Sequence, residues 1–118
     1  MKFGRLMIFI TNINEARSFY NGILGFEVTD ENDHSIIFDV GGVELIAFLG
    51  DKEREIGDYS NESRSVIVFE VSSVNETFQT LKAKGVRFLH EEPNETETNI
   101  YAAFVDPFKN VHEIEELK

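Results

Sequence analysis

The stretch Ile10-Thr11-Asn12-Ile13-Asn14-Glu15 returns later in the chain as Val71-Ser72-Ser73-Val74-Asn75-Glu76. Each copy follows a run of strand-forming residues and leads into a helical pattern that ends in a glycine, Gly25 in the first copy and Gly85 in the second. Self-similarity at a fixed period indicates a duplicated supersecondary unit, and this decides the architecture before any local pattern does. We also expect a ligand-binding cleft where the two copies meet.

Patterns on either side of the repeated stretch predict one strand, one helix and three further strands in each half. Asn12 with Glu15, and Ser73 with Glu76, form capping boxes that start the two helices. Alternating apolar residues and turn signals then predict the strands. The predicted strands are 3–10, 26–29, 34–40 and 43–49 in the first half, and 65–71, 86–89, 100–105 and 111–117 in the second.

Two βαβββ units in tandem predict an α+β fold. We expect their strands to form a cupped, partly closed, eight-stranded mixed sheet with the helices outside. At 118 residues the chain is expected to be a single domain, 1–118, with repeat halves 1–50 and 64–118 joined by a polar connector, 51–63.

The composition excludes several classes of partner. A net charge of −11 disfavours nucleic acid and anionic membranes, and no apolar run approaches the roughly 20 residues of a membrane span. There is no cysteine and no signal-peptide pattern at the N-terminus, so we expect a cytoplasmic protein. The acidic surface would steer a cationic ligand inward, although acidity that serves only solubility is the more ordinary explanation.

The stretch Ile10–Glu15 is followed along the chain by five further motifs. They are Phe19-Tyr20, Leu24-Gly25-Phe26, Val43-Glu44-Leu45, Phe104-Val105-Asp106-Pro107 and Asn110-Val111-His112-Glu113. In this order and at these spacings the chain resembles the vicinal oxygen chelate superfamily. That group includes glyoxalases, bleomycin-resistance proteins, fosfomycin-resistance enzymes and extradiol dioxygenases. The resemblance implies the fold more strongly than an activity, because members share a scaffold and differ in the site.

The resemblance implies four metal-ligand positions, and only two of them keep a ligand here. Metal-dependent members place one ligand on the first and one on the last strand of each half, which corresponds to Arg5, Glu44, Val66 and Glu113. The repeat supports this, since Arg5 and Val66 are 61 positions apart, as are Ile10 and Val71. A transition metal normally needs about three donors from His, Cys, Asp or Glu. Arg5 offers only hydrogen-bond donors, so we expect it to occupy the metal's place and pair with Glu44, and with Glu113 as a further partner.

Strand alternation predicts which other side chains share a face with these positions. The expected ligand-binding residues are Arg5, Met7, Phe9, Glu44, Ile46, Phe48, Val66, Val68 and Glu113. This mostly apolar set with a few charges is typical of a small-molecule pocket. The alternative is that the same residues pack the interior of the barrel shut.

Other candidate ligands are weaker. His112 neighbours Glu113 on one strand and should therefore face the helix side. His34 and His90 lie next to polar turns and are expected to be solvated. Glu70 shares a face with Val66, and both an inward and a solvated position remain open for it.

Three functions are compatible with these residues. The first is a metal-free protein of the bleomycin-resistance type, a cytoplasmic homodimer without cofactor that sequesters a cationic or aromatic compound. The second is a metal-dependent lyase, isomerase or dioxygenase in which Glu44, Glu113 and a third donor, His34, Glu70 or a partner-chain residue, hold Ni²⁺, Zn²⁺, Mn²⁺, Fe²⁺ or Mg²⁺. The third is an interaction module with a filled cup. Metal-free catalysis by a buried carboxylate also stays open.

Overall fold

The computed structural model describes residues 3–50 and 65–118. The predicted connector 51–63 lies outside the described residues. The chain divides into two compact units, Met1–Arg54 and Glu55–Lys118.

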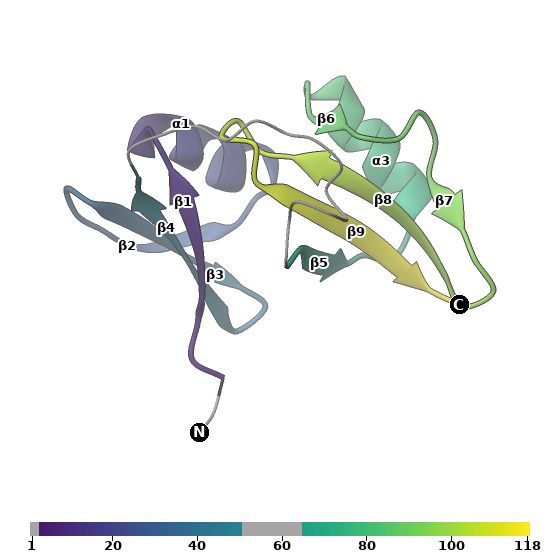
Figure 1. The fold of residues 1–118 in the computed structure, drawn as a ribbon, viewed down its shortest axis with the longest axis horizontal. Helices are drawn as coiled ribbons and strands as arrows, with labels where there is room; N and C mark the ends of the chain where they lie inside the picture. Colours follow the sequence, from purple (N-terminus) through teal and green to yellow (C-terminus); the bar gives the residue numbers. More distant parts are fainter. Residues whose placement is uncertain (1–2, 51–64) are drawn as a thin grey trace. The chain divides into compact units, whose positions relative to one another are not determined.

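The first unit is a four-stranded sheet with a helical segment on one face (Figure 1). The sheet order is β1-β4-β3-β2, in which β1 runs parallel to β4 and the other neighbours are antiparallel. The elements are β1 Leu6–Ile10, α1 Ile13–Arg17, the π-helix η1 Ser18–Ile23, β2 Glu27–Glu31, β3 Ser35–Val40 and β4 Val43–Leu49.

The second unit repeats this plan. Its sheet order is β5-β9-β8-β6, with β5 parallel to β9, and the short strand β7 also pairs with β8. The elements are β5 Ile67–Glu70, α3 Val74–Ala83, β6 Arg87–Phe88, β7 Asn94–Glu95, β8 Asn99–Val105 and β9 Val111–Leu117. The α+β class and the duplicated βαβββ plan are thus confirmed.

Two details of the prediction are corrected. In the described residues the strands lie in two hydrogen-bonded sheets, of four and five strands, and β7 is the strand that the eight-stranded prediction did not include. The sequence of β7, Asn94–Glu95, is too short and too polar to carry an alternating pattern. In the first half, the predicted single helix changes from α to π at Ser18, where Leu24 N–H donates to the Phe19 carbonyl five residues back.

At both helix starts the predicted N-cap side chain accepts a hydrogen bond from the N–H three residues on. The Glu15 N–H donates to Asn12 Oδ1 at 2.9 Å, and the Glu76 N–H donates to Ser73 Oγ at 3.2 Å. The Val74 N–H of α3 also donates to Glu116 Oε1 at 3.3 Å, a cap supplied by β9.

Each sheet buries one face under its own helix. In the first unit, Tyr20 lies 5.4 Å from Phe38 of β3 between ring centroids, and both side chains are fully buried. In the second, Phe78 of α3 packs on Phe88, which packs in turn on Phe104 of β8. Since side chains alternate along a strand, these contacts identify the helix-covered face and hence the opposite face of each sheet.

Candidate functional site

The face of the first sheet opposite its helix carries the predicted site residues of the first half, and we call it the first open face. The strand register arranges its side chains in three rows. One row is Phe9, Phe48 and Ser35; the next is Met7, Ile46, Ile37 and Asp30; the third is Glu44, Asp39 and Glu27, with Arg5 at the β1 end.

The third row begins with an ion pair. Arg5 Nη2 lies 3.3 Å from Glu44 Oε2, and both side chains are about half exposed, at 51% and 50%. This is the pairing expected from the sequence. Because a guanidinium has no acceptor and stays protonated, Arg5 presents a fixed positive charge at this point.

The other two rows are largely apolar and, on β1, open to solvent. Met7 and Phe9 are 52% and 59% exposed, whereas Ile8 and Ile10 between and beyond them are buried against the helix side. Ile46 differs from the other predicted lining residues, with 8% exposure, because it lies on a central strand between Met7 and Ile37. The predicted residues of the first half thus share one face of the sheet, and their role in ligand binding stays a prediction.

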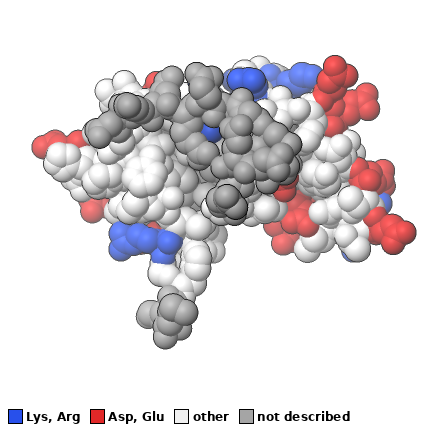
Figure 2. Space-filling model, viewed as in Figure 1, with Lys and Arg blue, Asp and Glu red and all other residues white. Residues whose placement is uncertain are grey.

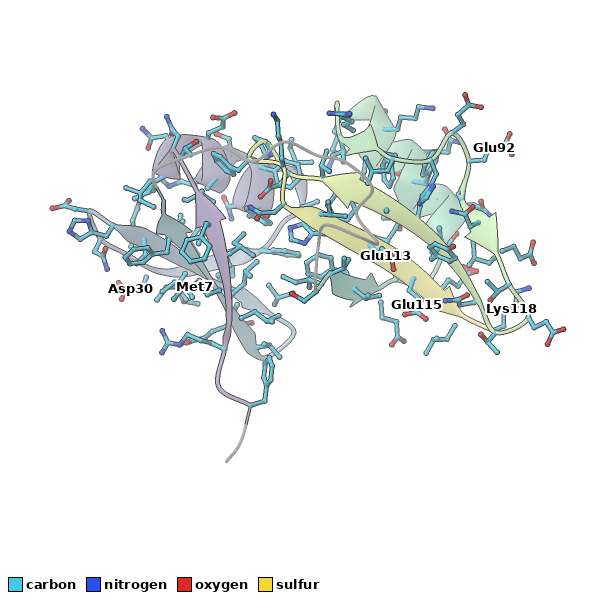
Figure 3. All side chains as sticks on the ribbon, viewed as in Figure 1. Met7, Asp30, Glu92, Glu113, Glu115 and Lys118 are labelled. Atoms are coloured by element: carbon cyan, nitrogen blue, oxygen red, sulfur yellow. The ribbon has the colours of Figure 1, made fainter. Side chains whose placement is uncertain are left out.

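The second unit has a corresponding open face, formed by alternate residues of β5, β9 and β8. Val68 lies opposite Glu113, and Glu70 opposite Glu115, across β5 and β9. Figure 3 shows Glu113 and Glu115 on β9, and Met7 on β1 of the first unit. Acidic side chains gather over this unit near β7 and the end of β9, as Figure 2 shows.

Val66 belongs to an apolar cluster in the second unit. It packs, together with Leu89, against Ala103, Val105 and Val111, which are buried. This part of the second open face is closed by side chains, as the alternative of a packed interior anticipated. The contrast with the exposed Met7 and Phe9 makes the first open face the better candidate for ligand contact.

The two retained acids do not occupy equivalent rows. Leu6 pairs with Leu45, so Arg5 lies beside Glu44. In the second unit Ile67 pairs with His112, so Glu113 pairs with Val68 and lies one row beyond Val66. The equivalence of Glu44 and Glu113 expected from the repeat is therefore offset by two residues.

The histidines lie apart from these rows. His112 is 1% exposed on the helix side, with ring centroids 5.6 Å from Phe69 and 5.5 Å from Phe104, and burial lowers its pKa to about 4. This confirms the predicted direction of its side chain. His34 is exposed, as expected, and its backbone N–H donates to Asn32 Oδ1. His90 is partly buried, with its ring 6.2 Å from Tyr101, which corrects the expectation of a solvated side chain.

Glu70, left open by the sequence, is exposed and lies opposite Glu115. The sequence reasoning missed Asp39 and Glu27, which extend the row that Glu44 begins. The signal for Asp39 was available, because a hairpin centred on Gly41-Gly42 places Asp39 directly opposite Glu44.

Arg5 stands beside Glu44 at a position where the resemblance implies a metal ligand. In the described ranges, 3–50 and 65–118, no group of three or more His, Cys, Asp or Glu side chains is arranged to hold one. Arg5 forms an ion pair with the carboxylate of Glu44, and the positive charge of Arg5 would repel a cation at the same point.

A family model described as the Glyoxalase/Bleomycin resistance protein/Dioxygenase superfamily matches residues 2–114. No curated protein matches the chain. Within the part that the structure describes, no helix has the length and apolar character to cross a membrane.

Solved structures share the fold at low sequence identity. A genomically encoded fosfomycin resistance protein from Listeria monocytogenes has a TM-score of 0.80 at 19% identity, covering 98% of this chain and 93% of that one. A glyoxalase family protein from Enterococcus faecalis has 0.79 at 23%, covering 98% and 97%. A lactoylglutathione lyase from Agrobacterium tumefaciens has 0.74 at 16%, covering 98% and 92%.

Proposed function

Since the chain belongs to the glyoxalase/bleomycin resistance protein/dioxygenase superfamily, we propose that it binds a small cationic or aromatic molecule without a metal ion. In this proposal the protein sequesters its ligand rather than converting it. It acts in the cytoplasm as a homodimer, and residues 1–118 form a single domain.

The ion pair between Arg5 and Glu44 carries the proposal. Arg5 stands at a position where the resemblance implies a metal ligand, and its guanidinium engages the acid that would be the neighbouring ligand. Val66, at the other such position, packs in an apolar cluster and has no donor atom. A cation held by Glu44 and Glu113 alone would lack the third protein ligand that catalytic sites normally have.

The first open face supplies apolar surface for the ligand. Phe9 and Met7 are more than half exposed and Phe48 is 38% exposed, which is unusual for such large side chains on one sheet face. Exposed apolar surface beside a few charged groups is typical of small-molecule sites. The net charge of −11 favours a cation over an anion as the ligand.

Elemental analysis of the purified protein tests the absence of metal. We expect a substoichiometric content of Ni, Zn, Mn and Fe, and clear uptake in the double variant Arg5→His with Val66→His, which places an imidazole at each of the two positions where the resemblance implies a metal ligand and this chain has none. The single variant Arg5→Lys is the matched control, because it keeps the positive charge and should take up no more metal than the wild type.

Thermal shift with a panel of cationic, neutral and anionic aromatic compounds tests the binding function, since a ligand that binds the native state raises its melting temperature. We expect shifts that do not change when EDTA or metal salts are added. If the wild type instead holds one equivalent of tightly bound metal, and the thermal shifts disappear when that metal is removed, the metal-dependent lyase, isomerase or dioxygenase is favoured. A panel without any shift would favour the interaction module.

A further inference from the structure

We propose that Asn21-Gly22 is a latent modification site, at which the Asn21 side chain becomes a succinimide and then an aspartate or isoaspartate when the π-helix η1 opens. It is the one Asn-Gly pair among the 118 residues of the chain. The pair lies in η1, on the helical segment that covers the first sheet through Tyr20 and Phe38. The inference does not depend on the proposed binding function.

The reaction at this pair needs no partner except water. The Gly22 backbone nitrogen loses its proton and attacks the side-chain carbonyl carbon of Asn21, and the bond from that carbon to Nδ2 breaks, so that ammonia leaves with the proton. Water then opens the cyclic imide at either of its carbonyls, which gives aspartate or isoaspartate. Glycine as the second residue favours ring closure, because it has no Cβ to crowd its nitrogen and its backbone is conformationally free.

The pair is accessible to solvent. Asn21 and Gly22 are both exposed, and a Cβ added at Gly22 would meet no heavy atom within 4 Å apart from the backbone of its own helix. None of the described neighbours therefore packs on Gly22. Protection of the pair in the native state has to come from the geometry of η1 itself.

Two hydrogen bonds hold Asn21 in a geometry that disfavours ring closure. Its Nδ2 donates to the Phe26 carbonyl at 2.8 Å, which ties the side-chain amide to the residue that follows the helix end. Its own carbonyl accepts from the Gly25 N–H at 3.1 Å, which fixes the helical backbone at this residue. In a helix the Cα–Cβ bond tilts toward the N-terminus, away from the nitrogen of the next residue. We therefore expect the reaction to proceed through local opening of η1.

The products cannot restore these contacts. An aspartate at position 21 has no N–H for the Phe26 carbonyl, and it places a negative charge in the last turn of a helix, where the dipole disfavours it. An isoaspartate also adds a methylene group to the main chain and turns the acceptor of the Gly25 N–H into a free carboxylate. Phe26 stacks on Tyr20, with ring centroids 6.2 Å apart, and Tyr20 packs on Phe38. Modification should thus loosen the helical cover of the first sheet.

Peptide mapping by mass spectrometry tests the inference on the full chain. The protein is incubated at mildly alkaline pH with and without urea, and the asparagine, aspartate and isoaspartate forms of the peptide that contains Asn21 are separated and quantified. We expect conversion in the native protein to be slower by on the order of tenfold or more than in urea, because the native site must open before it reacts. In urea, Asn21 should convert faster than Asn75, which precedes a glutamate.

Variants separate the chemistry from its structural consequence. Gly22→Ala, for which the structure has room, should slow the conversion in urea severalfold, and this measurement on the unfolded chain does not require the variant to fold. Asn21→Ala and Asn21→Asp should both lower the melting temperature, and Asn21→Asp more, since it adds a charge to the loss of the hydrogen bond. Asn75→Asp makes the same change at an exposed position in the first turn of α3, where the dipole favours an acid, and should not lower it.

Two results would overturn the inference. One is conversion of Asn21 that is equally fast with and without urea, because η1 would then give no protection. The other is conversion of Asn21 in urea that is no faster than that of Asn75, because the Asn-Gly pair would then have no special reactivity. Neither result bears on the proposed function, which is tested by metal content and by ligand-induced thermal shifts.

Discussion

Arg5 Nη2 lies 3.3 Å from Glu44 Oε2, and Glu44 lies directly opposite a second acid, Asp39, on the neighbouring strand. One guanidinium therefore shields one member of a row of carboxylates. Because both partners of the ion pair are about half exposed, solvent screens the attraction and its direct contribution to stability is small.

A double-mutant cycle on this ion pair should show an asymmetry. We expect a coupling energy of about 0.2–1 kcal/mol that falls with added salt. Arg5→Ala should be more destabilising than Glu44→Ala, because loss of the arginine leaves Glu44, Asp39 and Glu27 uncompensated. Urea unfolding at two salt concentrations measures both effects. Equal losses in the two single variants would show that repulsion along the row is negligible.

The burial of His112 makes stability depend on pH. Its pKa is about 4 in the folded protein, below the ordinary value of 6.5, so between these values the unfolded chain binds the proton and the native state does not. Stability is therefore fully present above pH 6.5 and falls as the pH drops toward 4, by about 3 kcal/mol in total from this group.

The variant His112→Phe should show a smaller loss of stability than the wild type between pH 7 and pH 4.5. Phenylalanine keeps a ring against Phe69 and Phe104 and removes the titrating group. His34→Ala, at an exposed position, is the control and should keep the wild-type dependence. Urea unfolding at several pH values measures how the free energy of unfolding depends on pH. The prediction is contradicted if His112→Phe leaves this dependence unchanged.

The turn before β9 depends on Asp106. Its buried carboxylate accepts hydrogen bonds from the Phe108 N–H at 2.9 Å, and from the Asn110 N–H at 2.7 Å and Asn110 Nδ2 at 2.8 Å. Asp106→Ala leaves these donors without their acceptor and should cost about 2–4 kcal/mol in the free energy of unfolding. Asp106→Asn retains one acceptor oxygen and should cost less. Chemical denaturation compares the two variants, and a negligible cost of Asp106→Ala would show that the turn does not rely on these bonds.

Both copies of the repeated stretch should contribute similarly to stability. Asn12→Ala and Ser73→Ala each remove a side-chain cap from the first turn of a helix, and each should cost about 1 kcal/mol. Ser72→Ala, one residue earlier and exposed, is the control and should change the stability little. Helix α3 keeps the cap from Glu116 to Val74 N–H, so a loss at Ser73 well below that at Asn12 would indicate that the tertiary cap substitutes for the local one.

Local patterns were sufficient for the duplicated plan of the fold. β4 and β9 have the predicted bounds, 43–49 and 111–117, because alternating apolar residues between strong turn signals leave little choice of register. β7 was not predictable in this way, since Asn94–Glu95 is a strand only through its pairing with β8. The π-helical turn at Ser18 was missed because the spacing of apolar residues does not distinguish a π-helical turn from an α-helix.

The same distinction between local pattern and tertiary contact applies to the candidate site. Sequence alone identified Arg5 and Glu44 as neighbours, because the repeat and the resemblance assign both to one face of adjacent strands. The share of Val66 in an apolar cluster, the two-residue offset of Glu113 and the burial of His90 came only from the tertiary structure. The physical reason is that strand identity and facing follow from a period of two along the chain, whereas register between strands and burial are settled by packing among residues far apart in sequence.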